Sequence, residues 1–598
     1  MGRRLASEWQ RRRRRGQTDV THPDVIIVGA GSAGSVLAAR LSEDPQRSVL
    51  VLEAGPSCTA QTRLPPEIRH VSSMAATVPG HPNNWAFTGT LTPELTYSVP
   101  RGKVIGGSSS INGAYFMRAV PEDFERWVQA GNDAWSFEQV LPYYRKLEDD
   151  RDFDGPFHGT GGPLPIKRQG DDLMSPLTAA FIDGCLQLGF VEDEDKNRPA
   201  PPGVGLVPLN AVDGLRVSTG IAYLIPSQRR PNLTVRGDAF VRRILFEGTR
   251  AVGVEAEIAG HREVIFAGEI VLCAGAICSP QLLMVSGVGP GEELRALGIH
   301  VVHDAAGVGK ELADHPELWI TYRPKRMMMP IHPHMAFHQA ALNYTADGSN
   351  IVGDMELICG VLTIGQITLG SGLFAVRGIA DIVQRPIRTL EGLRGVSMRR
   401  LLEQAQTSAD MPLVCGLQQE RSRGELRISS ADPHVPPALH YNYFADPEDL
   451  ERMRQGVRLA AELLETTPLR RMVASRTSPS DGDLASNRAL DRWMRTKLAT
   501  AIHMSSTCKM GPASDEHAVV DQLFRVRGVS GLRVVDTSAM PHLIRRGPNA
   551  TAVMMGERAA DFMIGEAQHI VPMSRPRLAP ERESIEPIGA GSAGPPAR

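Results

Sequence analysis

DVIIVGAGSAGSVLAARLSEDPQRSVLVLEAG, residues 24–55, is the stretch that decides the fold of this chain. Its apolar runs Val25–Val28 and Val49–Leu52 predict two buried parallel strands, and the residues between them predict a glycine-rich turn that leads into a helix. The turn has the GxGxxG spacing of a dinucleotide-binding loop. Gly29 permits the sharp turn, Gly31 lets the backbone approach a pyrophosphate, and Gly34 lets the helix pack closely on the strand.

The residues around this turn complete the predicted dinucleotide site. The helix would begin at Ser32 and Ala33, where free N–H groups and the helix dipole favour a phosphate. Glu53 follows the second strand about twenty residues beyond the last glycine, where a carboxylate accepts hydrogen bonds from a ribose, and Ala54 continues the same edge. The pattern alone does not distinguish NAD from FAD.

Length and composition suit two interleaved globular domains, because the chain has 598 residues and is 42% hydrophobic and 22% charged. A net charge of −2 provides no field that would recruit nucleic acid. We expect reduced thiols in a cytoplasm, rather than disulfides or a zinc site, because the seven cysteines are odd in number and form no CxxC pair.

Both ends of the chain are predicted to be disordered. Residues 1–23 form an Arg-rich leader with no apolar segment after the arginines, so a secretory signal is not expected; an arm for nucleic acid or anionic lipid is the alternative. Residues 571–598 are rich in Pro, Gly, Ala and Arg and predict a tail. The uncharged run Leu357–Val376 contains too many Gly, Thr and Ser residues for a membrane helix and predicts sheet or loop, with a peripheral membrane contact left open.

Other periodic segments predict elements scattered along the chain. Strands are expected at Leu233–Val235, Ala251–Ile258, Val264–Leu272 and Leu426–Ser429. Helices are expected at Asp123–Gln129, Val140–Leu147, Leu177–Leu188, Pro447–Glu465 and Thr551–Phe562.

Three further stretches are more specific than the glycine turn. They are RGKVIGGSSSINGAYFMR at residues 101–118, GAICSPQLLMVSGVG at residues 275–289, and the region 503–557 with HMSSTCKMG and LRVVDTSAMP. Together they closely resemble the glucose–methanol–choline (GMC) oxidoreductase family of flavoproteins over about residues 24–565, except for a block around 324–411. GNDAWSFEQVLPYYRKLE and MSSTCKMGPASDEHAVVDQ are similar to the actinobacterial subgroup associated with the redox carrier mycofactocin.

The resemblance implies an α/β fold, in which a Rossmann-like FAD-binding domain is interleaved with an α+β substrate-binding domain built on an antiparallel sheet with helices. The implied boundaries are 24–315 for the FAD-binding domain, with a substrate-domain insert at about 160–225, then 316–475 for mainly substrate-binding chain and 476–570 for the return to the FAD-binding domain.

The resemblance also assigns FAD to the glycine turn. It places pyrophosphate at Gly29, Gly31 and Gly34, ribose at Glu53, and adenine at the main chain of Val241. Asp536 would lie near the pyrophosphate–ribityl part, and the isoalloxazine would lie against Gly106, Gly107, Ser108 and Asn112. Some members attach FAD through a histidine at the place of Ile111, so noncovalent FAD is expected here.

His503 stands at the place of the family's catalytic base in HMSSTCKMG, with Met504 for the usual Pro and Ser506 for the usual Gly. Alcohol oxidation by a flavin needs such a proton acceptor while hydride leaves carbon. Asn549, where the family has His or Asn, would hydrogen-bond the substrate oxygen, and it could also cap the helix that follows it. His332, His334 and His338 form an HxHxxxH pattern without a carboxylate or thiol to complete a metal site, so no metal is expected.

The expected function is oxidation of a CH–OH donor by an FAD-dependent dehydrogenase. The subgroup resemblance implies a reduced carrier, mycofactocinol, as donor and a quinone or the respiratory chain as acceptor. The alternatives are a choline-type or general alcohol dehydrogenase or oxidase, a flavin-containing hydroxynitrile lyase, and a non-catalytic flavoprotein tethered by its leader.

Overall fold

The computed structural model describes residues 22–170, 173–325, 332, 334–369 and 407–567. The predicted leader, apart from its last two residues, and the predicted tail lie outside the described residues.

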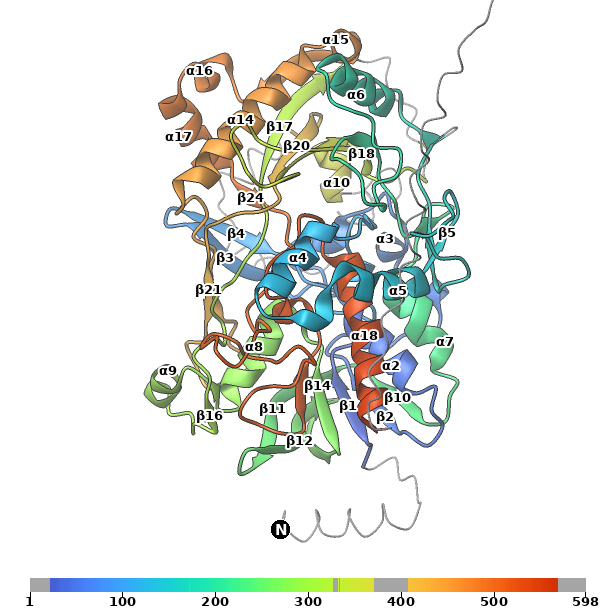
Figure 1. The fold of residues 1–598 in the computed structure, drawn as a ribbon, viewed down its shortest axis with the longest axis vertical. Coiled ribbons are helices and arrows are strands. Elements are labelled where there is room, and N and C mark those ends of the chain that lie inside the picture. The colour runs from blue at the N-terminus through green and yellow to red at the C-terminus, as the bar shows by residue number, and fades with distance from the viewer. Residues whose placement is uncertain (1–21, 171–172, 326–331, 333, 370–406, 568–598) are drawn as a thin grey trace, which may run out of the picture.

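A five-stranded parallel sheet occupies the lower half of the molecule (Figure 1). Its order is β10 (Leu233–Arg236), β2 (Val49–Leu52), β1 (Val25–Val28), β14 (Glu269–Leu272) and β25 (Leu532–Val534). Every residue of β1 and β2 is buried, as expected for apolar runs in a sheet that is covered on both faces. Helix α2 (Ser32–Leu41) packs on β1 and β2, and α18 (Asn549–Ala567) packs on α2.

The predicted strand Val264–Leu272 is wrong as a single element. Strand β13 (His261–Phe266) belongs to a three-stranded antiparallel sheet with β11 (Ala239–Glu247) and β12 (Arg250–Ile258), whereas β14 begins at Glu269 in the parallel sheet. The chain changes sheets at Ala267 and Gly268. Gly268 and the charged Glu269 mark this junction in the sequence, but the apolar residues before and after them join into one run when only hydrophobicity is followed.

A second, antiparallel sheet of seven strands occupies the upper half of Figure 1. The order is β23 (Val473–Ser478), β17 (Pro316–Pro324), β20 (Met411–Leu417), β19 (Met355–Gly360), β18 (His338–Tyr344) and β7 (Val204–Leu206), and β24 (Ala499–Thr500) also pairs with β17. Strand β7 comes from between strands of the lower half, so the two parts are interleaved in sequence as expected. Helix α14 (Pro447–Leu464) covers β20, β19 and β17.

Between these sheets lies a four-stranded one, in which β22 (Ala438–His440) pairs with β21 (Glu425–Arg427) and with β3 (Phe87–Thr92), and β3 pairs with β4 (Leu95–Val99). The predicted helices are confirmed at α4 (Pro121–Gln129), α5 (Phe137–Leu147), α6 (Pro176–Gln187), α14 and α18, each with small shifts at its ends.

The uncharged run predicted as sheet or loop divides into two kinds of structure. Its start lies in β19, as expected, but a short helix, α10 (Ile364–Leu369), follows. The remainder of the run falls outside the described residues. Within the described part of the chain, no helix has both the length and the apolar character needed to cross a membrane.

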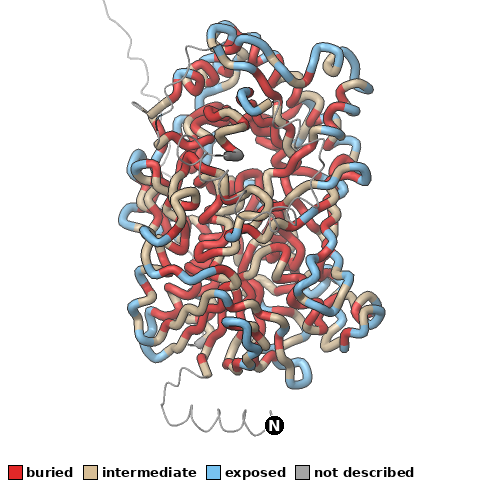
Figure 2. The backbone as a smooth tube through the Cα atoms, turned by 180° about the vertical axis from the view of Figure 1, so that it is seen from behind, coloured by how far each residue is buried: buried red, intermediate tan, exposed pale blue. Residues whose placement is uncertain are grey.

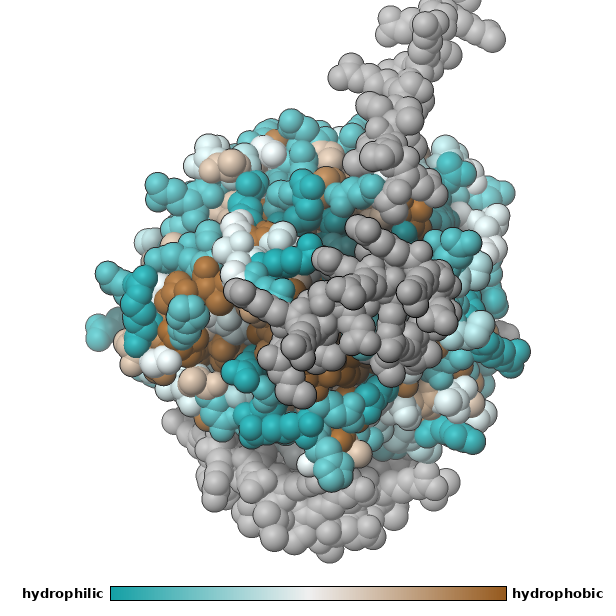
Figure 3. Space-filling view, turned by 90° about the horizontal axis from the view of Figure 1, so that it is seen from below, coloured by the Kyte–Doolittle hydropathy of each residue, from teal (hydrophilic) through white to brown (hydrophobic). Residues whose placement is uncertain are grey.

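Buried residues are concentrated in the middle of both halves, and exposed residues lie mostly at the rim (Figure 2). One continuous cluster of buried apolar residues reaches from the parallel sheet into the seven-stranded sheet. Seen from below, the described surface is mostly hydrophilic, with hydrophobic side chains gathered at the left of the view and others visible beside the grey atoms (Figure 3). The cluster of buried apolar residues therefore joins the parallel sheet to the seven-stranded sheet.

Candidate active site

A cavity of about 990 Å³ is lined by residues of both large sheets. It brings together most of the predicted site residues: Gly29, Gly31, Ser32, Ala33, Glu53, Ala54, Gly107, Ser108, Asn112, Val241, His503, Asp536 and Asn549. Gly34 and Gly106 do not line it. The cavity lies at the top of the size range of small-molecule sites, which is roughly 300–1,000 Å³.

The glycine turn has the geometry that its sequence requires. Gly29 has a φ of +99°, and a Cβ on Gly34 would lie 2.1 Å from the carbonyl oxygen of Gly29, so only glycine lets α2 lie this close to β1. Gly31 is the N-cap of α2 and no side chain caps that helix end. The first N–H groups of α2 therefore lie beside the cavity, where they favour an anion.

Glu53 lies at the carboxyl end of β2 and ties the turn to the strand. Its carboxylate accepts hydrogen bonds from the N–H groups of Ala30 at 2.9 Å and Gly55 at 2.8 Å. Burial raises the pKa of Glu53 to about 7, and these two hydrogen bonds act in the opposite direction. The predicted contact with a ribose stays a prediction.

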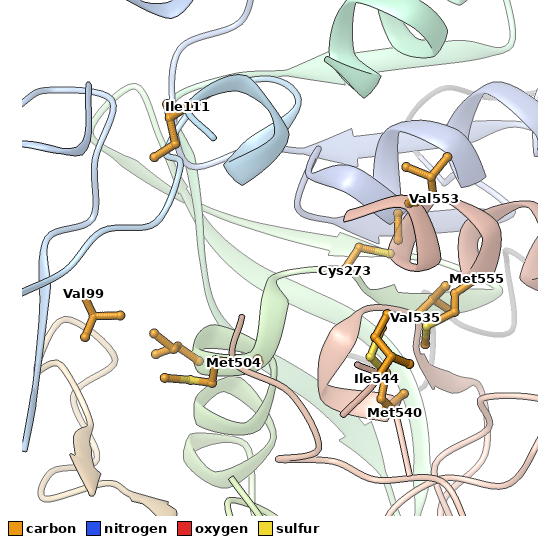
Figure 4. Packing of buried hydrophobic residues seen from close by; sticks show 14 of the residues in the cluster. Val99, Ile111, Cys273, Met504, Val535, Met540, Ile544, Val553 and Met555 are labelled. Atoms are coloured by element: carbon orange, nitrogen blue, oxygen red, sulfur yellow. The ribbon is translucent and has the colours of Figure 1, made fainter. Parts of the chain in front are cut away.

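The GGSSSIN loop lies against the glycine turn, because the N–H of Gly106 donates to the carbonyl oxygen of Ala30 at 2.7 Å. Gly106 shapes this loop from outside the cavity, while Ser108 and Asn112 line the cavity itself. Ile111 is 4% exposed, is one of the buried apolar residues labelled in Figure 4, and lines the cavity. Its aliphatic side chain offers no atom for a covalent bond to a cofactor.

Two other predicted contacts lie along the same cavity. Val241 precedes a bulge in β11, where the pairing with β12 shifts register. Asp536 accepts hydrogen bonds from Ser279 Oγ at 2.6 Å and from the N–H of Gly275 at 2.9 Å, so it holds the start of α8 (Gly275–Val285). Burial raises the pKa of Asp536.

His503 reaches the cavity from the loop after β24. Its backbone N–H donates to Asp314 Oδ1 at 2.6 Å, and its Nδ1 lies 2.9 Å from Nδ1 of His315. A Cβ on Gly547 would lie 3.4 Å from Nε2 of His503. Burial lowers the pKa of His503 well below its ordinary value, and His315, Arg101 and His338 lower it further. The imidazole is therefore neutral at neutral pH.

The two departures from the family motif are explained differently. Ser506 has a φ of +70°, the left-handed region that favours the usual Gly, and the cost for a residue with a side chain is about 1–2 kcal/mol. Met504 is 1% exposed and is one of the buried apolar side chains in Figure 4. Neither change displaces His503 from the cavity.

Asn549 is the first residue of α18, and not the residue before it, so the predicted capping position is wrong by one residue. The helix begins earlier than the apolar pattern indicates. Asn549 Oδ1 accepts a hydrogen bond from Ser32 Oγ at 3.1 Å. Its Nδ2 is buried without a hydrogen-bond partner among the described residues, which leaves an amide donor in the wall of the cavity.

Further polar residues in this wall were not predicted from the sequence. Tyr115 donates to Glu356 Oε1 at 2.6 Å, and Glu317, Trp319 and His338 also line the cavity. Burial, with Glu356 nearby, raises the pKa of Glu317 to about 8. Burial lowers the pKa of His338 to about 3. These residues are far apart in sequence, and no local pattern in the sequence identified them as one group.

The HxHxxxH pattern does not gather into one site. The rings of His332 and His334 contact each other, whereas His338 lies in the cavity wall with its ring against Phe337.

Within the described part of the chain, Glu148, Asp150 and His158 are close enough together to hold a metal ion. Arg118 pairs with Glu148, and Arg168 pairs with Asp150 at 2.6 Å. Because these guanidinium groups already balance the carboxylates, the cluster is an ion-pair network.

FAD fits this cavity on three observations. The uncapped start of α2 suits a pyrophosphate, the Asn549 amide lacks a partner, and the cavity continues from the glycine turn to His503.

Comparisons with known proteins agree with the geometry. Two family models described as GMC oxidoreductase match residues 23–317 and 420–556. The chain is 37% identical to an uncharacterised GMC-type oxidoreductase of Rhodococcus erythropolis, over 92% of this chain and 100% of that protein. It is 35% identical to an oxygen-dependent choline dehydrogenase of Rhizobium rhizogenes, over 94% and 97%.

Among solved structures, pyridoxine 4-oxidase from Mesorbium loti is 30% identical, with a TM-score of 0.77 over 90% of this chain and 99% of that one. A formate oxidase, 24% identical with a TM-score of 0.78 over 92% and 99%, shows the same fold. This chain therefore belongs to the GMC oxidoreductases, FAD-dependent flavoenzymes that act on the CH–OH group of their donors.

Proposed function

We propose that the chain oxidises a small alcohol, with His503 accepting the hydroxyl proton and Asn549 orienting the substrate oxygen. The observation that carries the proposal is a neutral imidazole, that of His503, which lines the same cavity as the glycine turn and whose Nε2 faces Gly547 in the cavity wall. When bound, FAD supplies the hydride acceptor.

The roles follow from charge and hydrogen bonding. A neutral His503 can take a proton at Nε2, and the Nδ2 group of Asn549 can donate to an alkoxide oxygen without competing for that proton. The N-terminus of α18 also reaches the cavity at Asn549, and its partial positive charge favours negative charge developing there.

The proposed donor is a reduced carrier of the mycofactocinol type, with a quinone or the respiratory chain as acceptor. The support is the similarity of residues 131–148 and 504–522 to the mycofactocin-associated subgroup.

A cationic alcohol of the choline type is the second candidate, and Glu317 favours it. Among the described residues no Lys or Arg forms an ion pair with Glu317, and the rings of Tyr115 and Trp319 lie in the same wall. A bound ammonium group would keep the Glu317 carboxylate ionised and would contact the aromatic faces. Relatives named choline dehydrogenases support the same candidate.

Anaerobic flavin bleaching tests the proposal. Choline, neutral alcohols and a reduced carrier are mixed in turn with the holoenzyme, and dye, quinone and oxygen are then compared as acceptors. Bleaching by any of these donors supports a redox enzyme, whereas cleavage of a cyanohydrin without bleaching would favour the lyase alternative. If choline is the donor, Glu317→Gln should raise its KM and leave that of a neutral alcohol unchanged.

A further inference from the structure

His315 and His503 form a direct contact that the proposed reaction does not yet use. Their Nδ1 atoms are 2.9 Å apart, and their rings meet edge to face with centroids 5.1 Å apart. At this distance one of the two nitrogens must carry a proton and the other a lone pair, because two lone pairs repel and two N–H groups collide. The position of that proton determines which nitrogen of His503 is free.

The hydrogen bond at the second ring nitrogen of His315, Nε2, determines which Nδ1 atom carries the shared proton. Its Nε2 lies 2.9 Å from the carbonyl oxygen of Ile544, and a carbonyl oxygen can only accept. Nε2 of His315 therefore carries a hydrogen. Because His315 is 0% exposed and its burial lowers its pKa to about 3, the ring is neutral and Nδ1 keeps its lone pair. The shared proton thus belongs to Nδ1 of His503, and Nε2 of His503 is left unprotonated.

We propose that His315 is a positioning residue that holds His503 in the tautomer whose Nε2 can accept the substrate's hydroxyl proton. This inference rests on the proposed role of His503 as base. The hydrogen bond persists after the proton transfer, because the imidazolium of His503 still donates from Nδ1 to His315.

Asp314 fixes the backbones of the two histidines relative to each other. Its Oδ1 accepts the backbone N–H of His315 at 2.8 Å and that of His503 at 2.6 Å, although the two histidines are 188 residues apart. The same carboxylate oxygen therefore fixes both backbones, and the ring–ring hydrogen bond fixes the tautomer.

Nitrogen NMR of histidine-labelled holoenzyme tests the inference without any substrate. The His503 signals are assigned by their loss in His503→Asn. The parent should show His503 protonated at Nδ1 and bare at Nε2. His315→Leu removes the acceptor and should let the Nε2–H tautomer of His503 appear. His315→Gln should suppress that tautomer again, because the glutamine amide can accept from His503 and donate to Ile544. A parent His503 protonated at Nε2 would overturn the inference, as would an unchanged tautomer in His315→Leu.

Kinetics provide the second measurement, with the donor that bleaches the flavin fastest in the screen above. His315→Leu should slow anaerobic flavin reduction about 10–100-fold, by analogy with the loss of the hydrogen-bond partner of a metal-ligating histidine, with unchanged substrate Kd and FAD content. His315→Gln should recover most of the rate. Equal rates in the parent and His315→Leu would refute the positioning role while leaving His503 as base. If no donor bleaches the flavin, the proposed function fails and the NMR result alone decides the role of His315.

Discussion

Gly31→Val should remove FAD from the protein and leave the fold almost intact. Gly31 has a φ of −77° and a ψ of −160°, an extended conformation that valine also adopts. A Cβ there would lie 3.7 Å from the carbonyl oxygen of Cys273 and 4.0 Å from Cα of Gly107, both ordinary contacts. Valine is a poorer N-cap than glycine, so the free energy of unfolding should fall by only about 1 kcal/mol.

The cost to cofactor binding is much larger. The added methyl groups stand at the start of α2, beside the N–H groups that a pyrophosphate would approach. Losing two charge-assisted hydrogen bonds of about 1.5–3 kcal/mol each weakens binding by about 3–6 kcal/mol. The Kd for FAD should therefore rise roughly 10²–10⁴-fold.

The assay titrates apoprotein with FAD by flavin fluorescence and follows thermal unfolding of the same samples. Gly34→Ala is the matched control, since its Cβ would lie 2.1 Å from the Gly29 oxygen and should force α2 off β1 at a cost of about 1–3 kcal/mol. Gly31→Val that purifies with a full complement of FAD would refute the reasoning. So would Gly31→Val apoprotein that is less stable than Gly34→Ala apoprotein.

Three further predictions concern the cofactor bond, the buried ion pairs and the substrate amide. Because Ile111 cannot form a covalent bond, acid precipitation should release all the flavin into the supernatant, and colour left in the pellet would contradict this. Burial lowers the pKa of His158, but contacts with Asp150, Asp195 and Glu148 raise it overall to about 10. The contribution of His158 to the free energy of unfolding should therefore be complete below about pH 6.5 and lost as the pH rises through about 10. His158→Gln should therefore melt at a lower temperature than the parent at neutral pH, and its melting temperature should fall less than that of the parent on going to pH 10. The same difference in melting temperature between variant and parent at both pH values would refute this. Asn549→Asp should slow flavin reduction more than Asn549→Ala, because a carboxylate repels the developing alkoxide; the reverse order in stopped-flow would exclude an orienting amide.

The fold was predictable where one contiguous stretch contains all the residues that form a structural unit. The run from Val25 to Glu53 contains both strands, the turn and the helix, and the structure has each of them. Prediction failed at Ala267 and Gly268, where a single apolar run was taken across a break between two sheets. The domain boundaries drawn from the sequence stay a prediction.

The site was predictable only in part, for a related reason. His503 and Asn549 stand in recognisable motifs, and the structure brings both to the cavity, although their roles stay predictions. His315 and Glu317 were not predicted, because their importance comes from packing against residues far away in sequence. His315 and His503 are 188 residues apart in the sequence, and no local sequence pattern predicts their contact.

Anaerobic stopped-flow reduction of His503→Ala tests the central claim most directly, with His261→Ala on the exposed surface of β13 as the control. The account predicts that His503→Ala keeps its FAD and that its flavin is reduced about 10²–10⁴-fold more slowly than in the parent, the usual contribution of a positioned proton acceptor. His261→Ala should match the parent. Reduction of His503→Ala as fast as the parent from about pH 6 to about pH 9 would contradict the assignment of His503 as the base.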